Sequence, residues 1–494
     1  MTSSTDAISR RGFLSAVTGI GLGVVAAGSG VSEGADADVS WTQPGATAGK
    51  TSWLPEGTGP TGELTTAWSV GETRDGSKTE IGAIVNGTVY AADSAIRAYD
   101  ATDGTERWSV KATVPQSDYD DSMRADIAVP SVVNDIVLAP VRIGNENETA
   151  HATIVAVEAD SGSKRWQLGV DSPKTFSPLT AYSDSVFCCG PALSGSNQSY
   201  VYRIDAQGSS ILWQAPIDLD TPGQNTALVA DGRVFVAETE GVTALDAPSG
   251  KVLWDALPDV NARNVPAVWN DTLIVWEAAY PGSTLIALDV ITGTELWKTA
   301  YGGETIVAVE AIDDDRVYLS MNNANTIIAL DRSDGSELWR ETLPETPPTD
   351  DRSPTGQVPT AGLARVGSLL YAGGSTLDPT DGTIRSTTAI TRPEIGGLEL
   401  AAVVDERCYF HGGSMHVLES VDAAAHTDDS KVTPDENTPN SDTPITQPNS
   451  ATTDSRSPDK RTETIPATST EGAGFGLLGG AVALMLAGWR QRSS

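Results

Sequence analysis

A short pattern ending in tryptophan recurs along the chain, and this repetition restricts the fold more than any other feature. Each of six copies has an apolar alternating run and an acidic residue eight positions before the tryptophan. Five copies have glycine four positions before it, and the third has its glycine one position earlier, at Gly208. The tryptophans are Trp108, Trp166, Trp213, Trp254, Trp297 and Trp339. They lie 58, 47, 41, 43 and 42 residues apart, a period typical of stacked or circular repeat architectures.

Each copy predicts a β-hairpin. The apolar run is a strand with one buried face, the acidic residue begins a tight turn, and glycine supplies the positive φ that such turns need. Another strand pair precedes each copy, as in segments 231–241 and 314–323. Units of about four short strands, repeated at this period, predict an all-β fold of the β-propeller type. A tryptophan at the same place in each blade predicts a repeated contact between neighbouring blades.

The ends of the repeat array predict how the ring closes. A seventh unit at 363–386 has Ser386 in place of tryptophan, and an eighth at 400–419 stops before its last strand. Segment 62–70 looks like the tail of a unit, with Trp68 at the motif position and no strands before it. We therefore expect this N-terminal strand to complete the last of eight blades. Seven blades are the alternative.

At 244–254 and 287–297 the chain resembles the PQQ-like repeat family, whose motif reads Ala-x-Asp-x-x-Thr-Gly-x-x-x-Trp. The resemblance covers roughly residues 65–420, and a WD-repeat alternative is weaker because only Trp254-Asp255 gives that dipeptide. The resemblance implies one of two roles. Quinoprotein dehydrogenases of the family hold pyrroloquinoline quinone and Ca²⁺ on the propeller axis, and some place a vicinal cysteine pair against the quinone. BamB-like members are scaffolds that bind no quinone.

The adjacent cysteines Cys188 and Cys189 are the one feature that matches a quinone site. They occupy a strand position where other units have small apolar residues, so we interpret them as core residues, with quinone contact as the alternative. We interpret His411 and His416 as a turn and a strand residue, and the acidic runs 118–121 and 313–315 as solvated turns.

No zinc spacing, nucleophile turn, phosphate loop or His-Glu-x-x-His motif is present in the sequence. We therefore expect no catalytic residue, no metal site and no cofactor. The favoured function is a non-enzymatic scaffold that binds another exported or membrane protein. The alternative is a PQQ- and Ca²⁺-dependent dehydrogenase that oxidises alcohols or sugars at the cell surface.

The charge is strongly acidic. With 66 acidic and 32 basic residues the net charge is −34, and only nine of the basic residues are lysine. Such a surface repels nucleic acid, so no nucleic-acid partner is expected. The composition resembles that of proteins from halophilic archaea.

The N-terminus predicts export. Arg10 and Arg11, followed by the charge-free apolar run 15–30, resemble a twin-arginine signal, which we assign to residues 1–35. A linker is expected at 36–61, before the propeller.

The C-terminus predicts an anchor at the outer face of the membrane. After a propeller at 62–422, the segment 423–471 is rich in threonine, serine, proline and aspartate, which indicates a disordered stalk. The uncharged run 472–489 is just long enough to span a bilayer, and basic residues follow it. We expect 472–494 to be a transmembrane helix or a sorting segment of the archaeosortase type.

Four sequons predict N-glycosylation outside the membrane. They are at Asn86, Asn147, Asn197 and Asn270.

Overall fold

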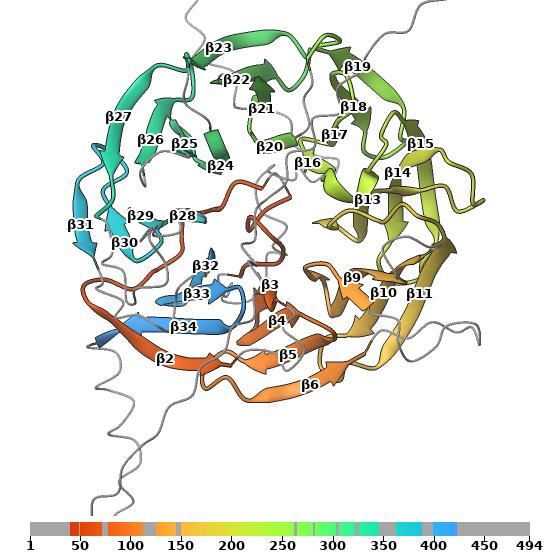
Figure 1. Cartoon of the computed structure of the whole chain (residues 1–494), viewed down its shortest axis with the longest axis horizontal. Coiled ribbons are helices and arrows are strands. Elements are labelled where there is room, and N and C mark those ends of the chain that lie inside the picture. The colour runs from red at the N-terminus through yellow and green to blue at the C-terminus, as the bar shows by residue number, and fades with distance from the viewer. Residues whose placement is uncertain are drawn as a thin grey trace, which may run out of the picture. The chain divides into compact units, whose positions relative to one another are not determined.

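The computed structural model describes residues 40–48, 50–71, 78–111, 125–144, 150–260, 264–279, 282–302, 306–321, 326–344, 362–387 and 399–421. The chain divides into two compact units, Met1–Val432 and Thr433–Ser494, and all described residues belong to the first. They form eight antiparallel blades arranged in a ring (Figure 1). The all-β propeller with eight blades is therefore confirmed, and the alternative of seven is wrong.

The first four blades follow chain order from the innermost strand to the outermost. Blade 1 consists of β3 (Glu80–Val85), β4 (Thr88–Ala92), β5 (Ile96–Asp100) and β6 (Glu106–Val110). Blade 2 consists of β7 (Ala125–Ile127), β8 (Ser131–Val133), β9 (Ile136–Ile143), β10 (His151–Glu158) and β11 (Lys164–Asp171), with β7 and β8 both paired to β9. Blade 3 consists of β12 (Thr180–Tyr182), β13 (Ser185–Pro191), β14 (Ser199–Asp205) and β15 (Ile211–Ile217). After the 3₁₀ turn η1 (Pro222–Gln224), blade 4 consists of β16 (Leu228–Ala230), β17 (Arg233–Ala237), β18 (Val242–Asp246) and β19 (Val252–Ala256).

The last four blades complete the ring. Blade 5 consists of β20 (Asn264–Trp269), β21 (Thr272–Ala279), β22 (Gly282–Asp289) and β23 (Glu295–Gly302). Blade 6 consists of β24 (Ile306–Ile312), β25 (Arg316–Met321), β26 (Thr326–Asp331) and β27 (Glu337–Thr342). Blade 7 consists of β28 (Leu363–Val366), β29 (Leu369–Ala372), β30 (Ser375–Leu377) and β31 (Ile384–Thr387), with the short β1 (Trp53–Leu54) added in parallel to β28. Blade 8 consists of β32 (Glu399–Val404), β33 (Arg407–His411), β34 (Met415–Ser420) and β2 (Leu64–Val70).

Blade 8 closes the ring with strands from both ends of the propeller. The N-terminal strand β2 pairs antiparallel with the last strand β34, from Leu64 opposite Ser420 to Val70 opposite Met415. The backbone N–H of Val421 then donates to the carbonyl of Glu63 at 3.0 Å. The prediction that the N-terminal strand completes the last blade is confirmed.

The repeated tryptophans join neighbouring blades. Each indole N–H donates to a backbone carbonyl in the hairpin turn of the next blade, at 2.8 to 3.2 Å. The seven pairs are Trp68 with Ala101, Trp108 with Ala159, Trp166 with Ala206, Trp213 with Ala247, Trp254 with Val290, Trp297 with Arg332, and Trp339 with Pro379. The apolar indole ring thus fills the space between two blades, while its N–H group is satisfied by a hydrogen bond.

A β-bulge precedes each of these tryptophans. In blade 5, Ala287 pairs with Trp297 while Leu288 pairs with Glu295, so Leu296 is left as the extra residue. The same shift occurs in the outermost strand of every blade. A bulge changes the direction of the side chains beside it, and here it turns the ring toward the next blade.

The acidic residue and the glycine of the motif shape the turn that receives the ring. The carboxylates of Asp100, Asp289 and Asp331 each accept the backbone N–H two residues later, which holds the turn. Gly335 has φ of +71°, and a Cβ there would lie under 3.0 Å from the Trp297 ring. In the third copy Ser209 takes the left-handed conformation instead, with φ of +60°. The motif is therefore a docking site for the preceding tryptophan.

Gly335→Ala should destabilise the propeller more than Gly232→Ala. Both glycines have φ near +70°, so either alanine costs about 1–2 kcal/mol in backbone strain. The alanine at 335 also collides with the Trp297 ring, which adds about 1–3 kcal/mol. The alanine at 232 meets no such clash, since nothing lies within 4 Å of a Cβ there. Chemical denaturation of both variants measures the difference. Equal losses of stability would contradict the docking role of the turn.

Candidate functional site

The centre of the ring is lined by the chain's own N-terminal segment, residues 40–61, here called the strap. Figure 1 shows it, in red, inside the innermost strands. Trp41 and Ile84 of blade 1 exchange two backbone hydrogen bonds, of 2.8 and 2.6 Å, and Trp41 is 2% exposed. The Thr42 carbonyl then accepts the N–H of Val132 in blade 2 at 2.9 Å. The segment predicted as a linker is, in its described part, built into the propeller.

A side chain makes the contact with blade 3. The Gln43 amide donates to the Ala181 carbonyl at 3.2 Å and accepts the Ala181 N–H at 2.7 Å, so it imitates the backbone of a paired strand. In blade 4 the N–H of Val229 donates to the carbonyl of Ala48 at 2.9 Å. In blades 1 to 4, a backbone group of the innermost strand thus forms a hydrogen bond with the strap. Without the strap, these groups would be unpaired at the edge of each sheet.

The strap goes on to contact the remaining blades. The ring of Trp53 packs edge-on against Trp269 of blade 5, with ring centroids 5.0 Å apart. The backbone contacts with blades 6, 7 and 8 are Ile312 N–H to Thr51 O (2.9 Å), Arg365 N–H to Ser52 O (2.8 Å), Gly367 N–H to Leu54 O (3.0 Å) and Glu406 N–H to Thr58 O (3.1 Å). The described residues of the strap therefore contact all eight blades.

The strap has a strained backbone and carries one lysine. Ala46, Lys50 and Ser52 have φ of 64°, 53° and 45°, values that non-glycine residues keep only where surrounding contacts hold them. The Lys50 ammonium donates to the Thr226 hydroxyl at 3.1 Å, and burial lowers its pKa. Within the described residues it forms no ion pair, so its hydrogen bond anchors the strap to blade 4.

The structure places Cys188 and Cys189 in β13, away from the axis. Adjacent strand residues point to opposite faces of a sheet. Accordingly, Cys188 packs in the cluster between blades 2 and 3, and Cys189 in the cluster between blades 3 and 4. Both are fully buried free thiols, and burial raises the pKa of each. Both thiols therefore lie in the packing between blades.

His411 joins blade 8 to blade 1. It is the last residue of β33, so its interpretation as a turn residue is wrong. Its Nδ1 accepts the backbone N–H of Ile81 at 2.8 Å, which requires a neutral ring. Burial, and to a smaller extent the charge of Lys78, lower the pKa of His411 to about 4. His416 lies in β34, as predicted, and its Nε2 lies 3.0 Å from the Ser414 hydroxyl.

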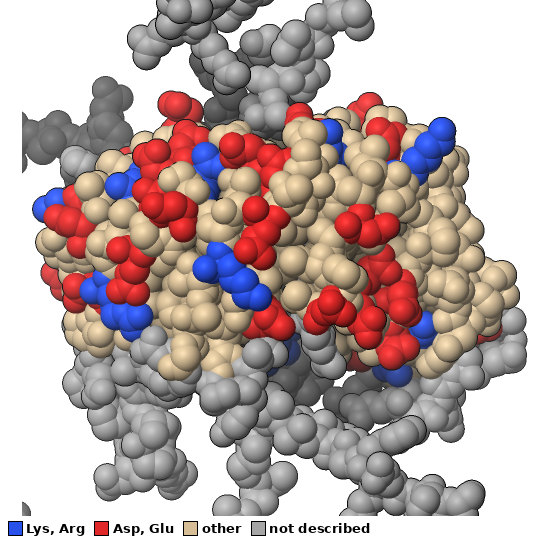
Figure 2. All heavy atoms as spheres, turned by 90° about the horizontal axis from the view of Figure 1, so that it is seen from above, with Lys and Arg blue, Asp and Glu red and all other residues tan. Residues whose placement is uncertain are grey.

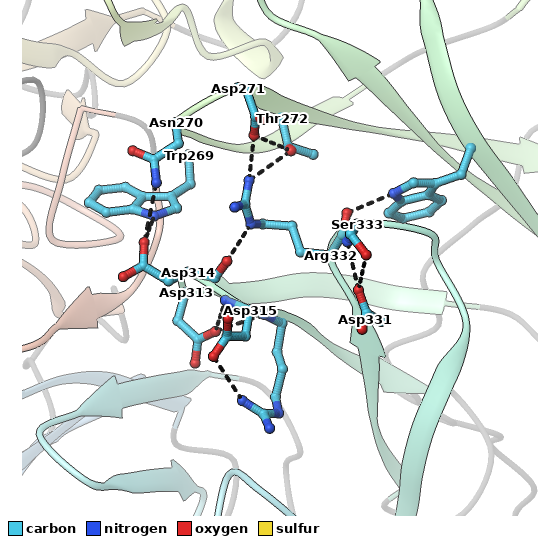
Figure 3. Close-up of polar contacts among 12 residues, drawn as sticks. Trp269, Asn270, Asp271, Thr272, Asp313, Asp314, Asp315, Asp331, Arg332 and Ser333 are labelled. Atoms are coloured by element: carbon cyan, nitrogen blue, oxygen red, sulfur yellow. Dashed lines mark hydrogen bonds and ion pairs between the residues drawn. The ribbon is translucent and has the colours of Figure 1, made fainter. Parts of the chain in front are cut away.

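The acidic run 313–315 joins blades 5, 6 and 7, and Figure 3 shows its contacts with blade 5. Asp313 is 5% exposed and accepts hydrogen bonds from the Tyr318 hydroxyl at 2.8 Å and from Arg365 of blade 7 at 3.3 Å. Asp314 accepts the Trp269 indole N–H of blade 5 at 2.9 Å. The interpretation of this run as a solvated turn is therefore wrong for Asp313, because a cation from the next blade compensates its burial.

Arg332 completes this network from the turn that receives Trp297. Its guanidinium donates to Asp271 at 2.6 Å and Thr272 at 2.8 Å in blade 5, and to the Asp314 carbonyl at 2.8 Å (Figure 3). These carboxylates serve blade packing. In the part of the chain that the structure describes, no group of three His, Cys, Asp or Glu side chains could hold a metal ion. The run 118–121 lies outside that part.

Blades 7 and 8 meet at a different kind of interface. Ser386 occupies the tryptophan position and lines a cavity of about 470 Å³, which adjoins a second cavity of about 530 Å³. They share Thr61, Ser368 and Leu369 in their walls. Hydroxyl groups and the Arg385–Asp378 ion pair supply the polar part of this seam cleft, which can form hydrogen bonds but offers no histidine or cysteine for catalysis.

Several predicted sites fall outside the described residues. These are Arg10, Arg11, Asn147, the stalk 423–471 and the segment 472–494. Asn86 and Asn270 lie exposed in hairpin turns, and Asn197 is exposed in the β13–β14 loop. None of the helices in the described ranges is long and apolar enough to cross a membrane.

Sequence reasoning missed the strap and the seam cleft. A signal for the strap was present, because Trp41 and Trp53 are two of the chain's 12 tryptophans, and large aromatic side chains are uncommon in flexible linkers. The cleft had a weaker signal in Ser386, which breaks the repeat at the position of the docking ring.

The fold and the repeated docking turn define a propeller of PQQ-like repeats. The family model described as outer membrane protein assembly factor BamB matches residues 67–187, 197–376 and 278–441. The chain belongs to this family. No curated protein matches it in sequence.

Similar solved structures show the same fold. The computationally designed protein Ika8 is 14% identical with a TM-score of 0.50, over 71% of this chain and 98% of its own. BamB from Moraxella catarrhalis is 14% identical with a TM-score of 0.38, over 74% and 92%. Quinohemoprotein alcohol dehydrogenase from Comamonas testosteroni is 12% identical with a TM-score of 0.49, over 77% and 80%. At these identities the likeness concerns the fold alone.

His411→Asn should remove part of the acid sensitivity of the propeller. The unfolded chain protonates this histidine near its ordinary pKa of 6.5, and the folded chain only near 4. The folded state therefore loses stability as the pH falls from 6.5 toward 4, by about 2–3 kcal/mol for a shift of this size. Urea unfolding at pH 8 and pH 4.5 measures the difference between wild type and variant.

At pH 8 the two proteins should have similar stability, because the asparagine oxygen can accept the Ile81 N–H. Parallel pH profiles of the two proteins would contradict the role assigned to the neutral imidazole.

Proposed function

We propose that this protein is an exported, membrane-anchored scaffold whose propeller binds another exported or membrane protein and catalyses no reaction. One observation carries the proposal. The strap lines the ring centre and contacts all eight blades, and the ring centre is where quinoprotein dehydrogenases of the family hold their quinone. A ring centre that binds its own chain leaves the rims and outer surfaces for partners.

The residues that the structure describes do not fit pyrroloquinoline quinone and Ca²⁺. Cys188 and Cys189 face opposite sides of β13 and are buried between blades. Among the described carboxylates, buried Asp313 is neutralised by Arg365. The alternative of a quinoprotein dehydrogenase would need the strap to leave the axis, at the loss of its contacts with every blade.

Location is part of the proposal. Arg10 and Arg11 support export by the twin-arginine route, and the apolar run 472–489 supports anchoring at the outer face of the membrane. Exposed sequons at Asn86, Asn197 and Asn270 suit glycosylation there. The acidic, lysine-poor composition suits a halophilic source.

Purified full-length protein, supplied with pyrroloquinoline quinone and Ca²⁺, should show no bound-quinone absorbance band and no dye-linked oxidation of alcohols or sugars. A quinoprotein dehydrogenase serves as the positive control. The matched variant is Cys188→Ser with Cys189→Ser, which should behave as the wild type does in this assay. Stoichiometric quinone binding that the double variant abolishes would refute the scaffold function.

Export and anchoring can be tested at the two ends separately. Changing Arg10 and Arg11 to lysine should leave precursor inside the cell, because the twin-arginine route reads that pair. Removing residues 472–494 should release the propeller into the medium. Cell fractionation with an antibody against the propeller measures both. Membrane retention of the shortened chain would place the anchor elsewhere.

A further inference from the structure

The bulge residue before each docking tryptophan divides the ring into two unlike halves. In four consecutive blades, 3 to 6, this residue is leucine, namely Leu212, Leu253, Leu296 and Leu338. In blades 1, 2 and 7 it is arginine, namely Arg107, Arg165 and Arg385, and in blade 8 it is Ala67. We call the outer surface of blades 3 to 6, with these four leucines, Val252 and Ile291, the leucine half-rim.

The half-rim holds most of the exposed apolar side chains. Leu212, Leu253, Leu296 and Leu338 are 50%, 47%, 46% and 44% exposed. Val252 and Ile291, also on these blades, are 57% and 51% exposed. Among the described residues, six of the seven large apolar side chains with this exposure lie here, and Val421 is the other. Single exposed apolar residues are ordinary, but their repetition at one position of four neighbouring blades is not.

The fold does not require leucine at this position. Where arginine replaces it, the guanidinium pairs with the acidic residue of the same motif. Arg107 pairs with Asp100 at 2.8 Å and Arg165 with Glu158 at 3.1 Å, and Arg385 pairs with Asp378. Blades 1 and 2 keep the same bulge and docking contact, and blade 7 keeps the bulge. The fold of blades 3 to 6 therefore does not depend on leucine at the bulge position.

Without arginine, the motif carboxylates of the half-rim keep their charge unpaired. Asp205, Asp246, Asp289 and Asp331 form no ion pair within the described ranges, although hydroxyl or backbone N–H groups bond to them. Figure 2 views the ring from the side of β19, β23 and β27, where Asp and Glu outnumber Lys and Arg. The half-rim thus presents apolar and anionic groups together.

We propose that the leucine half-rim is a docking surface for a protein partner that presents apolar side chains beside lysine or arginine. This inference rests on the scaffold function proposed above and names its binding face. The negative charge of the chain excludes two other occupants. It would repel a second copy of this chain, which has a net charge of −34, and it would repel an anionic lipid surface. A cationic, apolar protein surface can satisfy both kinds of group.

The test uses full-length protein and a synthetic helical peptide of leucine, lysine and alanine with one apolar and one basic face. The analogue with glutamate in place of lysine is the charge control. Leu253→Ser with Leu296→Ser should weaken binding of the basic peptide at least tenfold, measured by fluorescence anisotropy. Val421→Ser, an equally exposed apolar residue outside the half-rim, should leave binding unchanged. The glutamate peptide should not bind.

A second variant keeps the test valid if serine disturbs the strands. Leu253→Arg with Leu296→Arg copies the residues found in blades 1, 2 and 7, so its melting temperature should match that of wild type, while it also loses peptide binding. Equal affinity of wild type and both leucine variants, or no binding by wild type, would overturn the proposal.

Two other outcomes would also overturn it by assigning a different occupant. These are a leucine-dependent dimer in sedimentation and leucine-dependent binding to phosphatidylglycerol vesicles. Quinone binding at the axis would refute the scaffold function without changing these titrations, so the two proposals fail separately.

Discussion

The propeller depends on one hydrogen bond repeated seven times, from a tryptophan indole N–H to a carbonyl in the turn of the next blade. Three other features of each blade serve this bond. The bulge aims the ring, the left-handed turn residue makes room for it, and the acidic side chain holds the turn that carries the acceptor. Since every interface needs the same set, the sequence repeats it. The length of the blade varies more, since the tryptophans lie 41 to 58 residues apart.

The interface between blades 7 and 8 lacks a docking tryptophan, and the same constraint explains why. Blade 8 takes its outer strand from the N-terminus, so no hairpin turn links its third and fourth strands. A tryptophan from blade 7 would have no turn to dock on, and Ser386 stands there instead. The strap fills part of the space as it passes outward between the blades. Gly57 and Gly59 allow this passage, because a Cβ at either would lie under 3.0 Å from Val366 or Tyr371. The remaining space is the seam cleft.

Features that repeat could be predicted from the sequence, and features that occur once could not. The hairpins, the docking rings and the closing strand follow from local patterns seen in several copies. The strap has no period, because it gives each blade one or two contacts through different groups. Asp313 and Asp315 are near neighbours in one acidic run, yet only Asp313 is buried, and its partner Arg365 comes from another blade. The sequence placed Cys188 and Cys189 in a strand but did not reveal which interface each would fill.

The strap has a consequence for the order in which the molecule forms. It is made by the ribosome before any blade, yet its binding site consists of residues from all eight. It can reach its final position only after the last blade is present, and the closing strand β2, which follows it, must wait for β34 in the same way. Such distant pairings are slow to form. The propeller therefore matures as a whole after synthesis, with the strap and β2 settling last although they precede every other strand of the ring.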